Sequence, residues 1–137
     1  MKYRLYTAFL GLAVLVPSVS LFAHHAPSAI FDMKKVVTIT GTMTKVEWVN
    51  PHIQMYMDVK ESDGTVSNWK LESQPPRWFT KVGVGRADFA AAVGKSISVD
   101  IVAALDGSKY GYLHTITFAD GTKFSLNDSE TKDKINP

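Results

Sequence analysis

Residues 36–48 read VVTITGTMTKVEW, and this stretch decides the fold class. Its first half alternates apolar residues or glycine with threonine, the period-two pattern of a half-buried β-strand. The pattern then changes phase, because Val46 and Trp48 are apolar at even positions. One extra residue in a strand moves every later side chain to the other face, so we expect a bulge or bend within residues 41–45. A long bent first strand suits a small barrel, where it contributes to both sheets.

The rest of the chain continues this β pattern. Alternating or apolar runs follow at residues 52–59, 66–71, 97–103, 112–118 and 123–126. Three Asp-Gly pairs mark turns between them, at residues 63–64, 106–107 and 120–121. Two short helical pieces are expected at residues 77–82 and 86–93. This order predicts an all-β fold, a small antiparallel OB-like barrel of five to six strands with a short helical segment between strands three and four. A β-sandwich, the alternative, usually needs about seven strands.

The first 23 residues have the pattern of a cleaved signal peptide. Lys2 and Arg4 precede an almost wholly apolar run at residues 5–16, and the segment ends at Ala23. The run is shorter than the ~20 residues of a membrane-spanning helix, which disfavours the alternative of a retained anchor. A cut after Ser20 is the other alternative. We expect residues 1–23 to be removed, residues 24–126 to form the barrel in the periplasm with no stable membrane span, and residues 127–137 to form a polar, loosely ordered tail.

Charge and composition exclude several functions. Lys2 and Arg4 are the basic residues of the first 23, so cleavage leaves 13 basic residues against 13 acidic ones. A neutral domain lacks the basic face that nucleic-acid binding needs. The chain has no cysteine, which excludes thiolate metal sites and thiol nucleophiles. No nucleophile elbow, phosphate-binding loop or paired His-Glu motif is found, so we expect no enzyme.

The histidines are the candidate metal ligands. Cleavage after Ala23 would make His24 the first residue, with His25 beside it, and His52 follows an Asn-Pro turn. An α-amine and imidazoles are good nitrogen donors, and this set suits copper(II). The leading hypothesis is therefore a periplasmic binding protein that holds a copper ion through His24, His25 and His52, with Asp32, Glu47 or His114 as a further donor. The alternative is that the paired histidines are disordered and that His52 caps a turn.

The second hypothesis is a metal-independent interaction module. Its surface would comprise Gln54, Tyr56, Asn68 and Lys70, with Trp78 as an exposed contact or a lid over a barrel end, and its ligand would be a peptide, a glycan or a periplasmic partner protein. The remaining candidates are better explained as structural residues. Their spacing predicts core positions for Met55 and Met57, the core is also favoured for Trp48 and Trp69, and His114 is expected to share a half-buried face with Tyr112, Ile116 and Phe118.

Several motifs together resemble a known family. They are His24-His25 after the leader, Phe31-Asp32, the run GTMTKVEWVNPH at residues 41–52, Asp63-Gly64 before Trp69, and Asp120-Gly121-Thr122-Lys123. In these features the chain resembles domain-of-unknown-function family 6152, a group of small exported bacterial proteins. The resemblance covers nearly all the mature chain, although residues 73–94 fit it less well because of Pro75-Pro76-Arg77-Trp78. It implies export and a compact β fold, and it implies no activity.

Overall fold

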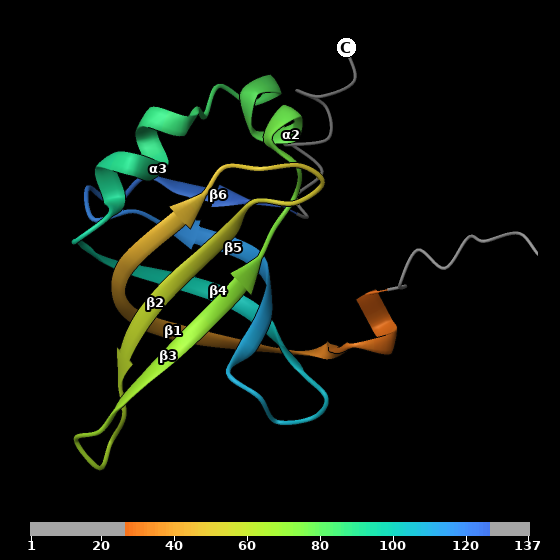
Figure 1. Cartoon of the computed structure of the whole chain (residues 1–137), viewed down its shortest axis with the longest axis vertical. Helices are drawn as coiled ribbons and strands as arrows, with labels where there is room; N and C mark the ends of the chain where they lie inside the picture. Colours follow the sequence, from red (N-terminus) through yellow and green to blue (C-terminus); the bar gives the residue numbers. More distant parts are fainter. Residues whose placement is uncertain (1–26, 127–137) are drawn as a thin grey trace, which may run out of the picture.

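The computed structural model describes residues 27–126 as one barrel with helices at one end (Figure 1). The expected signal peptide at residues 1–23, His24, His25 and the expected tail at residues 127–137 lie outside the described residues. The elements are, in order, η1 (Pro27–Ala29), β1 (Phe31–Glu47), β2 (Gln54–Lys60), β3 (Val66–Glu72), α2 (Pro76–Lys81), α3 (Arg86–Ala92), β4 (Ser96–Ala104), β5 (Tyr110–Thr117) and β6 (Lys123–Ser125). None of the helices in this part of the chain has the length and hydropathy to cross a membrane.

Strand β1 joins the two halves of the barrel. It pairs with β4 up to Thr42 and with β2 from Thr42 onward, and its register with β2 shifts between Met43 and Lys45. The expected bulge in residues 41–45 is therefore confirmed. Without the bulge, Met43 and Val46 would point to opposite faces of the strand, because one is at an odd and the other at an even position. With it, both face the same core: Met43 is fully buried and Val46 packs on the core cluster.

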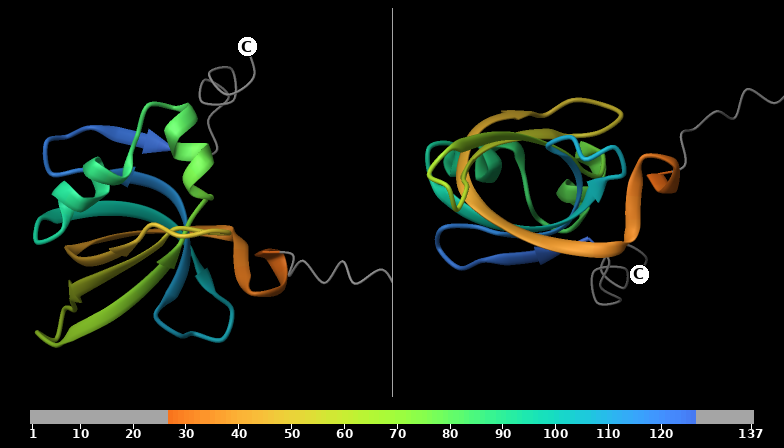
Figure 2. Two further views of the ribbon diagram at one scale, coloured as in Figure 1. Left: turned by 45° about the horizontal axis from the view of Figure 1, so that its top comes forward. Right: turned by 90° about the horizontal axis from the view of Figure 1, so that it is seen from below.

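The barrel closes through a parallel pair of strands. The sheet order is β3-β2-β1-β4-β5-β6, and β3 also pairs with β5, so the first five strands form a ring (Figure 2). Lys70 to Glu72 run parallel to Tyr110 to Tyr112, whereas the other described pairs are antiparallel. A parallel pair needs a long crossover, which α2, α3 and β4 supply. The OB-like barrel with a helical segment between strands three and four is confirmed, with this one pair departing from the antiparallel expectation.

The core fills the barrel and continues under the helices. The expected core positions are confirmed, since Met55 and Met57 are at most 1% exposed and Trp69 is 9% exposed. At the helical end Phe79 and Phe89 are fully buried and lie edge to face, with ring centroids 5.1 Å apart. Trp48 packs on both rings. Figure 1 shows α2 and α3 at one end of the barrel. Their phenylalanines thus form an aromatic layer with Trp48 at that end.

The turns follow the Asp-Gly signals. Asp63 accepts hydrogen bonds from the backbone and hydroxyl of Thr65, and Gly64 between them has a φ of 86°, which favours glycine. The same aspartate-to-backbone bond occurs in the two other turns, from Ser108 to Asp106 and from Thr122 to Asp120. Hydrogen bonds from the hydroxyl and the backbone N–H of the residue two positions later lower the pKa of each aspartate below its ordinary value.

Two local expectations were wrong. His52 does not open a strand, because β2 begins at Gln54. His114 does not share a face with Ile116, which is fully buried in the core cluster. The register of β5 with β4 shifts there, since Asp100 pairs with Thr115 while Ile101 pairs with Leu113. His114 is the extra residue of this bulge, and burial lowers its pKa although Asp100 opposes the shift.

Candidate functional site

The outer face of β1, β2, β3 and β5 carries an ordered set of polar and aromatic side chains. Met55 and Met57 point into the barrel, so the alternate positions of β2 point outward. Cross-strand pairing arranges the outward side chains in two neighbouring rows. One row is Lys45, Tyr56, Lys70 and Tyr110, and the other is Glu47, Gln54, Glu72 and Tyr112.

The first ion-paired group of this face surrounds Glu47. Its carboxylate accepts hydrogen bonds from Lys45 Nζ and from the Tyr56 hydroxyl, the latter at 3.1 Å. These two donors lower the pKa of Glu47, while burial and the bond to Glu47 raise the pKa of Tyr56. Lys45 Nζ also lies 5.1 Å from the centre of the Tyr56 ring. Tyr56 is thus held in place, half-buried, by two charged neighbours.

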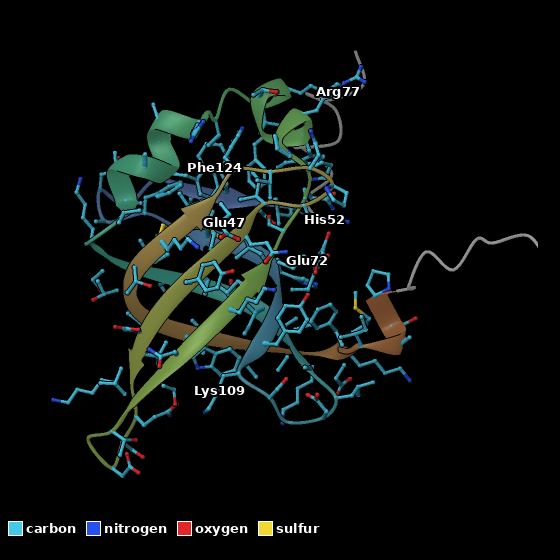
Figure 3. The ribbon with its side chains drawn as sticks, in the orientation of Figure 1. Glu47, His52, Glu72, Arg77, Lys109 and Phe124 are labelled. Atoms are coloured by element: carbon cyan, nitrogen blue, oxygen red, sulfur yellow. The ribbon has the colours of Figure 1, made fainter. Side chains whose placement is uncertain are left out.

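The second group surrounds Glu72, at the end of β3. The Tyr110 hydroxyl donates a hydrogen bond to Glu72, and Lys70 Nζ lies 5.7 Å from the centre of the Tyr110 ring. Burial and the Glu72 carboxylate raise the pKa of both Tyr110 and Tyr112. Both phenols are therefore neutral hydrogen-bond donors at ordinary pH. Figure 3 shows Glu47 and Glu72 on the same side of the barrel, toward its helical end.

A groove of about 430 Å³ opens on this face at the β1 bulge. At its side, Asn68 Nδ2 donates a 2.6 Å hydrogen bond to Asp58 Oδ1. This bond leaves Asp58 Oδ2 and Asn68 Oδ1 as acceptors for other groups. The residues that line the groove are Thr44, Lys45, Tyr56, Met57, Asp58, Asn68, Trp69 and Lys70.

The structure brings together part of the predicted interaction surface. Tyr56, Asn68 and Lys70 line the groove, and Gln54 lies in the neighbouring row opposite Glu72. Trp78 is apart from them, on α2, where its half-buried ring meets Phe79 edge to face at 5.0 Å. Trp78 therefore belongs to the aromatic layer over the barrel end.

His52 is the one predicted metal ligand within the described residues. Its Nδ1 lies 2.8 Å from the carbonyl oxygen of Ser73 and 3.7 Å from Glu72 Oε1. A carbonyl only accepts, so the bond requires a proton on Nδ1, and in the neutral ring the lone pair is then on Nε2. The side chain is 39% exposed. A metal-binding histidine usually donates its other ring N–H to a carbonyl or carboxylate oxygen in this way.

The start of β1 reaches the same side of the barrel. Phe31 is buried, and its ring lies 5.0 Å from that of Tyr110 and 5.8 Å from that of Tyr112. Tyr110 is bonded to Glu72, which faces His52. The segment before Phe31 therefore joins the barrel beside the Glu72 group.

Other donors considered with the histidines do not join this group. Within residues 27–126, no three His, Cys, Asp or Glu side chains gather closely enough to hold a metal ion. Glu47 is engaged by Lys45 and Tyr56, and His114 lies on β5 near Asp100. His24 and His25 are outside the described residues.

Sequence reasoning did not find Glu72 or its pairing with Tyr110. They come together because β3 and β5 pair in parallel, and they lie 38 residues apart in sequence. No local sequence pattern predicts such a pair, because each residue fits the alternating pattern of its own strand.

Comparison with known proteins gives a family and no activity. No curated protein and no solved structure matches the chain. The sequence profile of a family described as a family of unknown function (DUF6152) matches residues 13–114, most of the chain and all of the barrel as far as His114 in β5. The chain therefore belongs to the DUF6152 family.

Proposed function

We propose that the protein is a periplasmic binding module whose β2–β3 groove takes up a segment of an uncharged oligosaccharide. The observation that carries this proposal is the groove itself, which joins an aromatic ring, Tyr56, to the hydrogen-bonded pair Asp58 and Asn68. The face of strands two and three is where OB-folds bind oligosaccharides and oligonucleotides, which supports the placement as a fold-level analogy.

The charges of the groove select between these two ligand classes. Lys45 and Lys70 are balanced by Glu47 and Asp58, so the face carries no excess positive charge for phosphates. The Asp58 and Asn68 pair offers acceptors and an amide donor side by side, which suits the hydroxyl groups of a sugar. Tyr56 contributes an aromatic ring to the lining of the groove. A neutral polyhydroxylated ligand therefore fits better than a polyanion.

The test is a titration with soluble tetrasaccharides of glucose and of N-acetylglucosamine, followed by calorimetry and amide chemical shifts. Tyr56→Ala and Asn68→Ala are each expected to weaken binding at least tenfold, about 1.4 kcal/mol, because each removes a direct contact. Thr40→Ala is the matched control, since Thr40 bonds Ser98 on the outer face of β1 and β4, away from the groove. Binding that survives both groove substitutions would contradict the proposal, as would binding of an extended peptide but of no sugar.

A second candidate, copper binding by the N-terminal histidines with His52, is favoured by one specific observation. Nδ1 of His52 is hydrogen-bonded to the carbonyl oxygen of Ser73, so Nε2 is the nitrogen that could bind a metal ion. Pro27 lies only two residues after His25, a reach of about 7 Å in extended chain, and the segment from Pro27 leads to Phe31 beside the Glu72 group. These facts support a site shared by the N-terminal segment and His52.

For this candidate we expect one copper(II) ion per natively processed chain that begins at His24. His52→Ala is expected to weaken binding at least tenfold, while the control His114→Ala leaves it unchanged. Affinity should fall as the solution is acidified, because protonated imidazole cannot bind metal. Mass spectrometry determines whether the processed chain begins at His24. A copper titration measures the stoichiometry and the affinity. Stoichiometric binding unaffected by His24→Ala and His52→Ala would exclude this site.

A further inference from the structure

A second cavity, of about 240 Å³, lies between α3 and the β5–β6 hairpin. It is separate from the groove, because the two share no lining residue. Figure 3 shows Phe124, one of its lining residues, near the helices and apart from Lys109 at the other end of the barrel. The lining residues are Gly83, Val84, Asp88, Ala91, Ala92, Lys95, Phe118, Ala119, Asp120, Thr122 and Phe124.

The cavity has an apolar floor that is fixed before any ligand binds. Val84 is 2% exposed and Ala92 is 5% exposed. The half-buried rings of Phe118 and Phe124 stand edge to face at 6.3 Å, and Phe118 also packs on the buried Phe89 at 5.6 Å. A preformed apolar surface of this kind suits a hydrocarbon or aromatic group.

Three charged side chains surround this floor. Asp88 and Asp120 supply carboxylates and Lys95 supplies an ammonium group, and none of them takes part in an ion pair within 4.0 Å among residues 27–126. Asp88 Oδ2 accepts the backbone N–H of Gly85, and Asp120 Oδ1 accepts that of Thr122. A carboxylate has about four lone-pair sites, so each can accept a further donor. Hydrogen bonds from Thr122, with a smaller effect of Lys95, hold the pKa of Asp120 low.

The combination of size and charge selects a ligand class. The cavity is smaller than the ~300–1,000 Å³ of pockets that take drug-sized molecules. A purely anionic ligand would meet two carboxylates and a purely cationic one would meet Lys95. A zwitterion can satisfy both signs while its apolar part covers the floor. We infer that this cavity binds a free α-amino acid with a large apolar side chain, its carboxylate at Lys95 and its ammonium group at Asp120.

The test is an amide chemical-shift titration of the natively processed protein with L-phenylalanine. Two matched ligands each lack one charge, phenethylamine without the carboxylate and 3-phenylpropionate without the ammonium group. L-phenylalanine is expected to shift the amides of Val84, Phe118 and Phe124, and each analogue is expected to bind at least tenfold more weakly.

Two substitutions assign the charges. Lys95→Gln is expected to weaken L-phenylalanine at least tenfold and leave phenethylamine unchanged, and Asp120→Asn is expected to weaken L-phenylalanine and leave 3-phenylpropionate unchanged. Lys109→Gln is the control, since Lys109 pairs with Glu61 and lies over Trp69 at the other end of the barrel. Thermal unfolding checks that each variant is folded.

The inference is overturned if L-phenylalanine shifts none of these three amides, or if all three ligands bind equally. It is also overturned if the two substitutions change nothing. Sugar binding at the groove is tested separately, with the Tyr56→Ala and Asn68→Ala variants. Either proposal can therefore be rejected while the other is upheld.

Discussion

Replacing Phe89 by alanine is expected to lower the free energy of unfolding by about 3–5 kcal/mol. Phe89 is fully buried, and its ring packs against Trp48, Phe79 and Phe118 at centroid distances of 5.4, 5.1 and 5.6 Å. Removing the ring takes its apolar surface out of the core and leaves a void that three other rings cannot fill. A domain of this size has a total stability of about 5–15 kcal/mol, so the variant should lose a large part of it.

Urea unfolding followed by circular dichroism measures this loss. Val93→Ala is the matched control, because Val93 ends α3 four residues later and is 40% exposed, so its loss should stay within about 0.5 kcal/mol. A loss below about 1 kcal/mol for Phe89→Ala would mean that the aromatic layer at the helical end contributes little to the barrel.

The aromatic layer also shows how far sequence reasoning could go. The two helical pieces were expected at residues 77–82 and 86–93, and α2 and α3 agree with them to within a residue or two at each boundary. Local signals suffice there, because Gly83, Gly85 and Gly94 interrupt the apolar runs. Both helices place a phenylalanine against Trp48. This contact depends on tertiary packing, so no local sequence pattern could predict it.

The same division applies to the strands. The bulge of β1 leaves a trace in the sequence, because the apolar residues move from odd positions before residue 44 to even positions after it. The bulge of β5 leaves none, since Tyr112, His114 and Ile116 form an unbroken alternation. Only the pairing with β4 shows that His114 is the extra residue and that Ile116 faces the core. A bulge can thus be predicted only where the alternation of apolar and polar residues changes phase with it.

The candidate site divides in the same way. Tyr56, Asn68 and Lys70 could be grouped from sequence, because β2 and β3 form a hairpin whose Asp-Gly turn sets the register. Glu72, Tyr110 and Phe31 could not, because they meet through the closing pair and through the far end of β1. Long-range closure therefore decides which side chains surround His52, and that is where the sequence provides no guide.

Gly41→Ala is expected to destabilise the protein by about 3 kcal/mol, the upper end of the range for overpacked positions. A Cβ at this position would lie 2.4 Å from the backbone carbonyl oxygen of Asp58 and 3.1 Å from its carbonyl carbon. Both atoms belong to the β2 backbone, so they cannot rotate away as a side chain could. Relief requires β1 and β2 to separate where their ladder begins, at Thr42 and Asp58.

Two other glycines provide the comparison for this prediction. At Gly111 the nearest atom is Ile101 Cδ1, at 2.6 Å, the flexible end of a side chain, so Gly111→Ala should cost less than Gly41→Ala. At Gly85 the nearest atom is Asp88 Oδ2, at 3.7 Å, so Gly85→Ala should cost below about 1 kcal/mol. Urea unfolding of the three variants gives their order, and an equal loss in all three would refute the steric argument.

Gly41→Ala also connects stability to the proposed binding face. The strands it forces apart are those that carry Lys45, Tyr56 and Asp58 along the groove. Folded Gly41→Ala protein should therefore bind tetrasaccharide at least tenfold more weakly, although Gly41 itself does not line the groove. Gly111→Ala should keep its affinity, because its clash lies with a side chain of β4. Unchanged affinity in folded Gly41→Ala protein would show that the groove does not depend on the β1–β2 register.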